Sequence, residues 1–149
     1  MGFKVRGLAP IKANMDRVGD RVEKRSIEWL RQAAGIVANE AKMRAPVDEG
    51  DLESAIKAKD DPEIRGMNRR KTVSVYVDLD ALDLEGSHAG FDYATWAHEA
   101  VYNLGPLSQQ KDAMTPVGVG PKYLERALDD NVPRLMRIIE EMTRKAIRQ

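Results

Sequence analysis

Apolar residues recur at helical spacing through the first third of the chain. From Met15 to Arg44 no proline interrupts, and charged residues fill most positions between the apolar ones. This pattern predicts an amphipathic helix. Thirty residues would form a helix about 45 Å long, so we expect one end to project beyond the core or to lie against a neighbour. Residues 1–13 are predicted to form an N-terminal arm. The apolar positions are Val18, Val22, Trp29, Ala33, Ile36, Val37 and Ala41.

The pattern changes in the segment MRAPVDEGDLESAI, residues 43–56. Pro46 cannot continue a helix and Gly50 permits a turn, so we interpret the segment as a structural elbow. Asp51 leaves an alternative open, because it could cap one short helical turn before the strand begins. The strand-like alternation that follows is carried by Leu52, Ser54 and Ile56.

Strict alternation of valines predicts a strand near residues 73–77. We expect it to form an antiparallel hairpin with the strand after the elbow, turning through residues 60–68. Residues 93–101, YATWAHEAV, are compatible with either helix or strand. Residues 104–121 are rich in glycine and proline, which predicts a long, mobile loop.

A second helical stripe runs from Tyr123 to Arg148, with Pro133 inside it. The helix either restarts there, with Asp130 or Asn131 as its N-cap, or kinks. Two long helices separated from a small antiparallel sheet predict an α+β domain. We therefore expect a single domain over residues 1–149.

Charge is distributed in blocks of opposite sign. The chain has 24 basic and 24 acidic side chains, which argues against a protein whose whole surface binds nucleic acid. Residues 1–47 carry five surplus positive charges, residues 48–63 five surplus negative ones, and residues 64–71 four positive charges without an acid. Such blocks suit surfaces that meet complementary surfaces, on copies of the chain or on partners.

The sequence offers little chemistry. It has no cysteine, and His88 and His98 do not form a spacing that would place both on one helical face. Asp48, Glu49 and Asp51 lack the ligand pattern of a calcium loop, and no nucleophile motif is recognisable. We expect no catalytic residue, no metal and no cofactor, and conclude that the chain is not an enzyme.

Three short motifs follow one another in a recognisable order. The first is the elbow, and the second lies in DYATWAHEA. The third, GPKYLERAL, opens the last helix. Their residues are Ala45, Pro46, Val47, Asp48, Gly50, Leu52, Ser54 and Ile56; then Tyr93, Ala94 and Glu99; then Pro121, Tyr123, Leu124 and Ala127.

In these motifs the chain resembles the neck or tail-completion proteins of long-tailed phages, typified by the gene-ten product of a lambdoid siphophage. The resemblance implies a virion structural protein at the head–tail junction, assembled in the host cytoplasm. It implies a homo-oligomeric ring, hexameric or alternatively dodecameric. The implied partners are the neighbouring head-connector and tail-terminator or tail-tube proteins, with non-specific contact to channel DNA as a further possibility and no membrane.

The chain departs from the family pattern at the elbow, where Glu49 replaces the usual threonine and Asp51 a usual basic residue. The basic segment offers a second interpretation, a small nucleic-acid-binding module that uses residues 64–71 and 17–31. Under either interpretation, the residues expected to touch a partner or DNA are Arg65, Arg69, Arg70 and Lys71.

Overall fold

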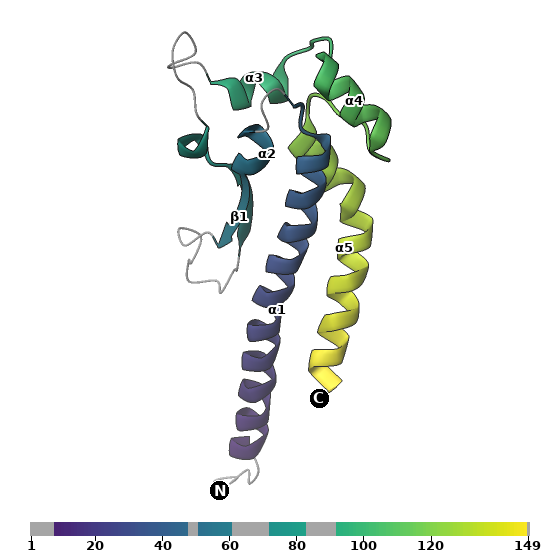
Figure 1. Ribbon diagram of the computed structural model, residues 1–149. Coiled ribbons are helices and arrows are strands. Elements are labelled where there is room, and N and C mark those ends of the chain that lie inside the picture. Colours follow the sequence, from purple (N-terminus) through teal and green to yellow (C-terminus); the bar gives the residue numbers. More distant parts are fainter. Residues whose placement is uncertain (1–7, 48–50, 61–71, 83–91, 149) are drawn as a thin grey trace, which may run out of the picture.

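The computed structural model describes residues 8–47, 51–60, 72–82 and 92–148, and it is an α+β structure (Figure 1). Two long helices, α1 (Leu8–Arg44) and α5 (Tyr123–Arg148), run antiparallel and side by side. A two-stranded antiparallel sheet of β1 (Ile56–Asp60) and β2 (Val73–Val77) contacts α1. The predicted fold class is confirmed. The shorter elements are α2 (Asp51–Ala55), the 3-10 helix η1 (Leu79–Ala81), α3 (Tyr93–Glu99) and α4 (Pro106–Met114).

Small side chains let α1 and α5 pack closely. Ala34, Ala38 and Ala41 of α1 are buried, as are Ala127 and Ala146 of α5. Because a methyl group occupies little space, two such helices can approach to the short end of the usual 8–10 Å range. The N-terminal turns of α1 continue beyond the C-terminal end of α5 (Figure 1). One end of the long first helix therefore projects, as its length predicts.

The sheet contacts α1, and β2 faces α5 across a gap that all three elements line (Figure 1). Its register pairs Ile56 with Val77 and Asp60 with Val73, which confirms the predicted antiparallel pairing. Of the predicted turn over residues 60–68, Asp60 belongs to β1, and residues 61–68 lie outside the described part of the chain. Ile56 is fully buried. The far end of β1 is joined to α1 by Arg31, whose guanidinium donates to both carboxylate oxygens of Asp60 at 3.0 and 2.6 Å.

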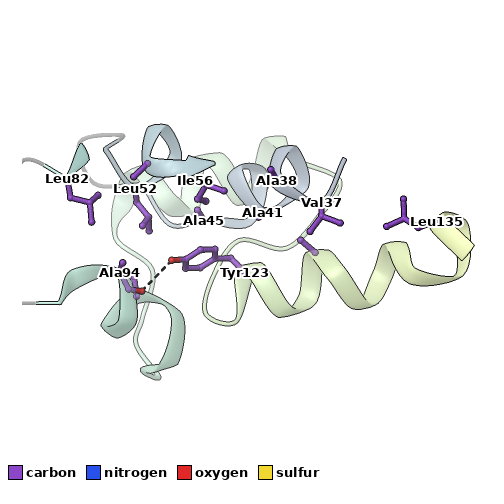
Figure 2. Close-up of a cluster of buried hydrophobic side chains, with 13 residues drawn as sticks. Val37, Ala38, Ala41, Ala45, Leu52, Ile56, Leu82, Ala94, Tyr123 and Leu135 are labelled. Atoms are coloured by element: carbon purple, nitrogen blue, oxygen red, sulfur yellow. Dashed lines mark hydrogen bonds between the residues drawn. The ribbon is translucent and has the colours of Figure 1, made fainter. Parts of the chain in front are cut away.

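The core is centred where α1 ends and α5 begins, which we call the elbow end of the molecule (Figure 2). Tyr123 is fully buried there, and its hydroxyl donates to the carbonyl oxygen of Ala94 at 3.3 Å. Burial raises the pKa of the Tyr123 phenol well above its usual value, so the hydroxyl remains a donor at neutral pH. Leu52 and Leu82 are buried in the same cluster.

The structure corrects two predicted boundaries and decides three points that the sequence left open. The first helix begins at Leu8, so residues 8–13 of the predicted arm are helical; Pro10 is tolerated because its missing N–H falls in the first turn. The short helical turn left open after the elbow exists as α2, and the strand begins only at Ile56. Segment 93–101 is helical up to Glu99. The last helix runs through Pro133 without restarting.

The prediction of a loop over residues 104–121 is wrong for Pro106–Met114, which form α4. Pro106 occupies the start of this helix, where no N–H is needed for the helical ladder, and Gly105 precedes it as N-cap. The remaining glycines and prolines of the segment all follow Met114. They end the helix instead of preventing it.

Candidate functional site

The elbow is stabilised by groups that satisfy the end of α1. The last carbonyls of a helix have no partner within the helix. Here the Lys111 ammonium of α4 donates to the carbonyl oxygens of Lys42 and Ala45 at 2.6 and 2.7 Å, and the Gly120 N–H donates to that of Arg44 at 2.9 Å. A cation at a helix C-terminus also opposes the negative end of the helix dipole. Two segments distant in sequence therefore cap α1.

Ser108 fixes the residue after the predicted helix-breaking proline. This serine is buried, and its hydroxyl both accepts from the N–H of Val47 at 2.8 Å and donates to the Val47 carbonyl at 2.9 Å. Both polar groups of one elbow residue are thus satisfied by one side chain of α4. Sequence reasoning missed Ser108 and Lys111, because they lie in a segment predicted to be an irregular loop.

The first motif divides between core, surface and undescribed positions. Leu52 and Ile56 are buried in the core. Ala45 and Pro46 are buried at the end of α1, whereas Ser54 is exposed and its hydroxyl donates to the Asp51 carbonyl at 2.8 Å. Asp48 and Gly50 lie outside the described residues.

The second and third motifs are brought together in space. Tyr123 reaches Ala94, as described above, and the Lys122 N–H donates to the His98 carbonyl at 2.7 Å. The Lys122 ammonium binds the Glu99 carboxylate at 2.6 Å. Bonds from Lys122 and then from His98 hold the pKa of the Glu99 carboxyl below its usual value.

The remaining motif residues lie around the same contact. Ala127 is fully buried beneath it. Leu124 and Tyr93 are partly buried and pack against the core. The Pro121 carbonyl accepts a long bond of 3.4 Å from Arg126.

A charged network links α1 to α5 below the elbow. Arg44 is 5% exposed, and its guanidinium binds the carboxylates of Glu40 on α1 and Asp130 on α5. The Asn131 amide, also buried, donates to Glu40 and to the Ala127 carbonyl. Burying a charge is costly unless it is paired and hydrogen-bonded, and here it is both. No sequence pattern predicts this network, because the residues that meet between the two helices are 86 and 91 positions apart in the chain.

An apolar groove of about 620 Å³ opens between β2 and α5, with α1 as its floor. We call it the α1–α5 groove. Leu128, Val132 and Met136 of α5 form one wall and are 48%, 41% and 62% exposed. Val73 and Val75 of β2 form the other wall, and the floor includes Ala33 and Ala34. This groove arises only from tertiary packing, so the sequence stripe of α5 could not reveal that part of it stays open.

Apolar side chains are also exposed on the N-terminal half of α1. Ile11 and Met15 are 57% and 69% exposed, and Val18 and Val22 are partly exposed. Their spacing of four, three and four residues places them on one face of the helix. We call these four residues the α1 stripe. It extends the predicted stripe of the first helix toward the N-terminus.

The described residues contain no group of three or more histidine, aspartate or glutamate side chains that could hold a metal ion. Within the same part of the chain, none of the helices combines the length and apolar character that crossing a bilayer requires. His88 and the predicted contact residues Arg65, Arg69, Arg70 and Lys71 lie outside it. The described residues form an elbow whose segments are hydrogen-bonded to one another, and they expose two apolar surfaces. Exposed apolar surfaces are typical of proteins that associate with other proteins.

Comparison with known proteins agrees with this interpretation. Residues 9–96 match the model of the HK97-gp10-like family, described as "Bacteriophage HK97-gp10, putative tail-component". The match includes α1, the elbow, both strands and most of the second motif, whereas Glu99 and the third motif lie beyond it. No curated protein and no solved structure gave a match. Since the match spans more than half of the 149 residues, the chain belongs to this family of non-enzymatic structural components of phage tails.

Proposed function

We propose that this chain is a ring-forming protein of the head–tail junction, which connects the head connector to the tail. Membership of a family of phage tail components carries the proposal. A ring needs two different surfaces on every copy, because each subunit contacts its two neighbours with different faces. The α1 stripe and the α1–α5 groove are two such surfaces, one convex and one concave.

The elbow supports this role mechanically. A protein that contacts a neighbour on each side needs surface elements with fixed relative positions. Here α1, α4 and the start of α5 are joined through Lys111, Ser108 and Gly120. We propose that this interlocked end faces one neighbouring layer of the particle, while the projecting end of α1 serves contact within the ring.

The expected partners follow from the position in the particle. They are further copies of this chain in a hexameric or dodecameric ring, the head-connector protein on one side, and the tail-terminator or tail-tube protein on the other. The four positive charges of residues 64–71 suit contact with channel DNA, which would be non-specific because phosphates carry no sequence information.

The proposal is tested with a phage whose copy of this gene is deleted. We expect DNA-filled heads and separate tails in the lysate, and joined particles when the chain is supplied in trans. A cryo-electron microscopy map of the complemented particle should show the chain as a ring between head and tail. Joined, infectious particles without the chain, or density for it elsewhere, would contradict the proposed position.

The alternative of a nucleic-acid-binding module makes a different prediction. Affinity for duplex DNA would then fall steeply with salt, with a slope of about 0.9 log units per contacted phosphate. The basic part of α1 is also mixed in sign, since Asp20, Glu23 and Glu28 lie among its arginines and Arg31 is paired with Asp60. We expect weak affinity and a shallow salt dependence in a filter-binding or anisotropy titration.

A further inference from the structure

The α1 stripe and the α1–α5 groove are exposed surfaces of matching type. The stripe is convex and helical, with apolar positions spaced as in a helix that packs against other helices. The groove is lined by valines, leucines, alanines and methionine from α1, β2 and α5. Large exposed apolar surfaces on one molecule mark sites of association.

The two surfaces also agree in size. On α5 the groove is lined from Leu124 to Ile139, a length of about 22 Å at 1.5 Å per residue. The stripe from Ile11 to Val22 is about 16 Å long on the same measure, so it fits within the groove. Alanine in the floor leaves room for a second helix to approach α1.

One chain cannot fill its own groove with its own stripe. Met15 lies fifteen residues before Leu30, the first residue of α1 that lines the groove. Both belong to one uninterrupted helix, which separates them by about 22 Å. A stripe that occupies the groove must therefore belong to another molecule.

Charges beside the two surfaces are complementary. Arg21 borders the stripe, three residues after Val18, and Arg17 lies one turn before Arg21. On α5, Glu125 lines the groove and Asp129 follows it by one turn beside the Val132 wall. Opposite charges at the rim of an apolar contact fix its register and exclude wrong partners. This pairing favours a second copy of the same chain over an unrelated apolar helix.

We propose that the α1 stripe of one copy docks in the α1–α5 groove of the next copy, and that this contact builds the ring. The inference rests on the proposed ring function and specifies its interface. Because stripe and groove are different surfaces, the contact is head-to-tail and every copy both gives and receives a helix. Closure then depends on the rotation between neighbours and not on a two-fold axis.

Cysteine pairs test the contact directly, since the natural chain has no cysteine. Met15→Cys and Met136→Cys replace exposed side chains, 69% and 62% exposed, on the stripe and on the groove wall. We expect mild oxidation of an equimolar mixture of the two variants to give mainly the mixed disulfide dimer. A chain carrying both changes should give a ladder of covalent oligomers ending at the ring size. The matched control pairs Met15→Cys with Met114→Cys, a 78% exposed residue on α4, and should give little product.

The same experiment is performed on the purified full-length chain and on assembled particles, so that a ring formed only in the virion is still detected. Absence of the 15–136 disulfide in both settings overturns the proposed contact. A preference of Met15→Cys for itself also overturns it, because that result indicates a symmetric pairing of α1 helices. In either case a ring seen by cryo-electron microscopy would leave the proposed function intact, whereas absence of the chain from the junction would remove the function itself.

Mixing assembly-deficient variants gives an independent test. Ile11→Asp with Met15→Asp disables the stripe, and Val132→Asp with Met136→Asp disables the groove wall. Neither variant should assemble alone, but the two together should form a dimer, because one intact stripe still meets one intact groove. Light scattering after gel filtration measures this, with Met114→Asp as the variant that keeps wild-type assembly. Circular dichroism checks that all variants remain folded, and assembly of either double variant alone contradicts the proposal.

Discussion

Gly120 occupies a position where the backbone limits the choice of side chain. Its φ is 144°, a value that residues with a Cβ rarely adopt, and no atom lies within 4 Å of the place where a Cβ would stand. The restriction therefore comes from the backbone and not from crowding. Its N–H must point at the Arg44 carbonyl to cap α1. The glycine thus lets the chain turn into α5 while keeping that bond.

Replacing this glycine should weaken the fold. We expect Gly120→Ala to lower the free energy of unfolding by about 1–3 kcal/mol, the usual cost of a strained backbone conformation. Gly105→Ala is the matched control, since Gly105 has a φ of −66° and open space around it. Urea denaturation measures both. Equal effects of the two changes would show that the positive φ does not restrict Gly120.

Asp92 gives a prediction of pH dependence at the N-cap of α3. Its carboxylate accepts from the Thr95 hydroxyl at 2.6 Å and from the Thr95 N–H at 2.9 Å, and these bonds lower the pKa of Asp92 below its ordinary value of 3.8. A lowered folded-state pKa means that the cap stabilises fully above pH 3.8 and is lost as pH falls through the lowered value.

We therefore expect Asp92→Ala to destabilise the chain at pH 7, with the difference from wild type shrinking below pH 3.8. Carboxyl NMR titration should show the low pKa of Asp92 directly. Thr95→Val removes the hydroxyl donor and should move that pKa back toward its ordinary value. A wild-type pKa at or above the ordinary value would contradict the capping role.

The motif residues could be identified from the sequence, but their structural role in the core could not. Tyr123, Ala94 and Ile56 are buried members of the core, so the motifs record packing. Ser108 and Lys111 also stabilise the elbow, through hydrogen bonds to its backbone. The sequence does not identify them, because a serine or lysine in a glycine-rich segment is typical of any loop. Their role depends on which carbonyls lie opposite, which only the tertiary structure decides.

At the scale of elements, length and period decided what could be predicted. Residues 123–148 repeat their apolar stripe over seven turns, and the predicted bounds match α5. The five residues of α2 are too few for a period of two to be told from one of 3.6. For α4 a signal was present, since Pro106 follows Gly105 and the next eight residues contain neither proline nor glycine. The glycine and proline content of residues 104–121 taken together does not reveal this helix start, because most of these glycines and prolines follow Met114.

The pairing of α1 with α5 yields a prediction at this scale. Arg44→Met keeps an apolar stem but leaves the Glu40 carboxylate, whose side chain is only 16% exposed, without its cation. Breaking a largely buried pair in this way costs on the order of 3 kcal/mol. Arg31→Met on the same helix removes the exposed bridge to Asp60 and should change stability far less. Thermal and urea unfolding compare them. Similar losses from the two variants would mean that burial of the Arg44 network adds nothing.

The whole molecule combines one interlocked end with one projecting end. The elbow end satisfies its polar groups through Lys111, Ser108 and Arg44. At the opposite end the N-terminal turns of α1 extend past α5 (Figure 1), and Ile11 and Met15 in this part of the helix are exposed. Such a shape is stable as a single chain yet leaves apolar surface for a neighbour. Sequence length and charge blocks predicted association, whereas the location of the receiving groove required the packing of three elements.

This division predicts that the stability of the whole chain depends on its concentration. A partner that binds only the folded state stabilises it by about 2.7 kcal/mol when free partner reaches a hundredfold excess over Kd, which for a chain of this size raises Tm by several degrees. We therefore expect the Tm of the wild type to rise with chain concentration in differential scanning calorimetry. Met15→Asp should keep the dilute-solution Tm at every concentration, because it removes docking without touching the core, whereas Met114→Asp should behave as wild type. A Tm of Met15→Asp that still rises in parallel with the wild type would mean that the copies associate through a surface other than the projecting helix.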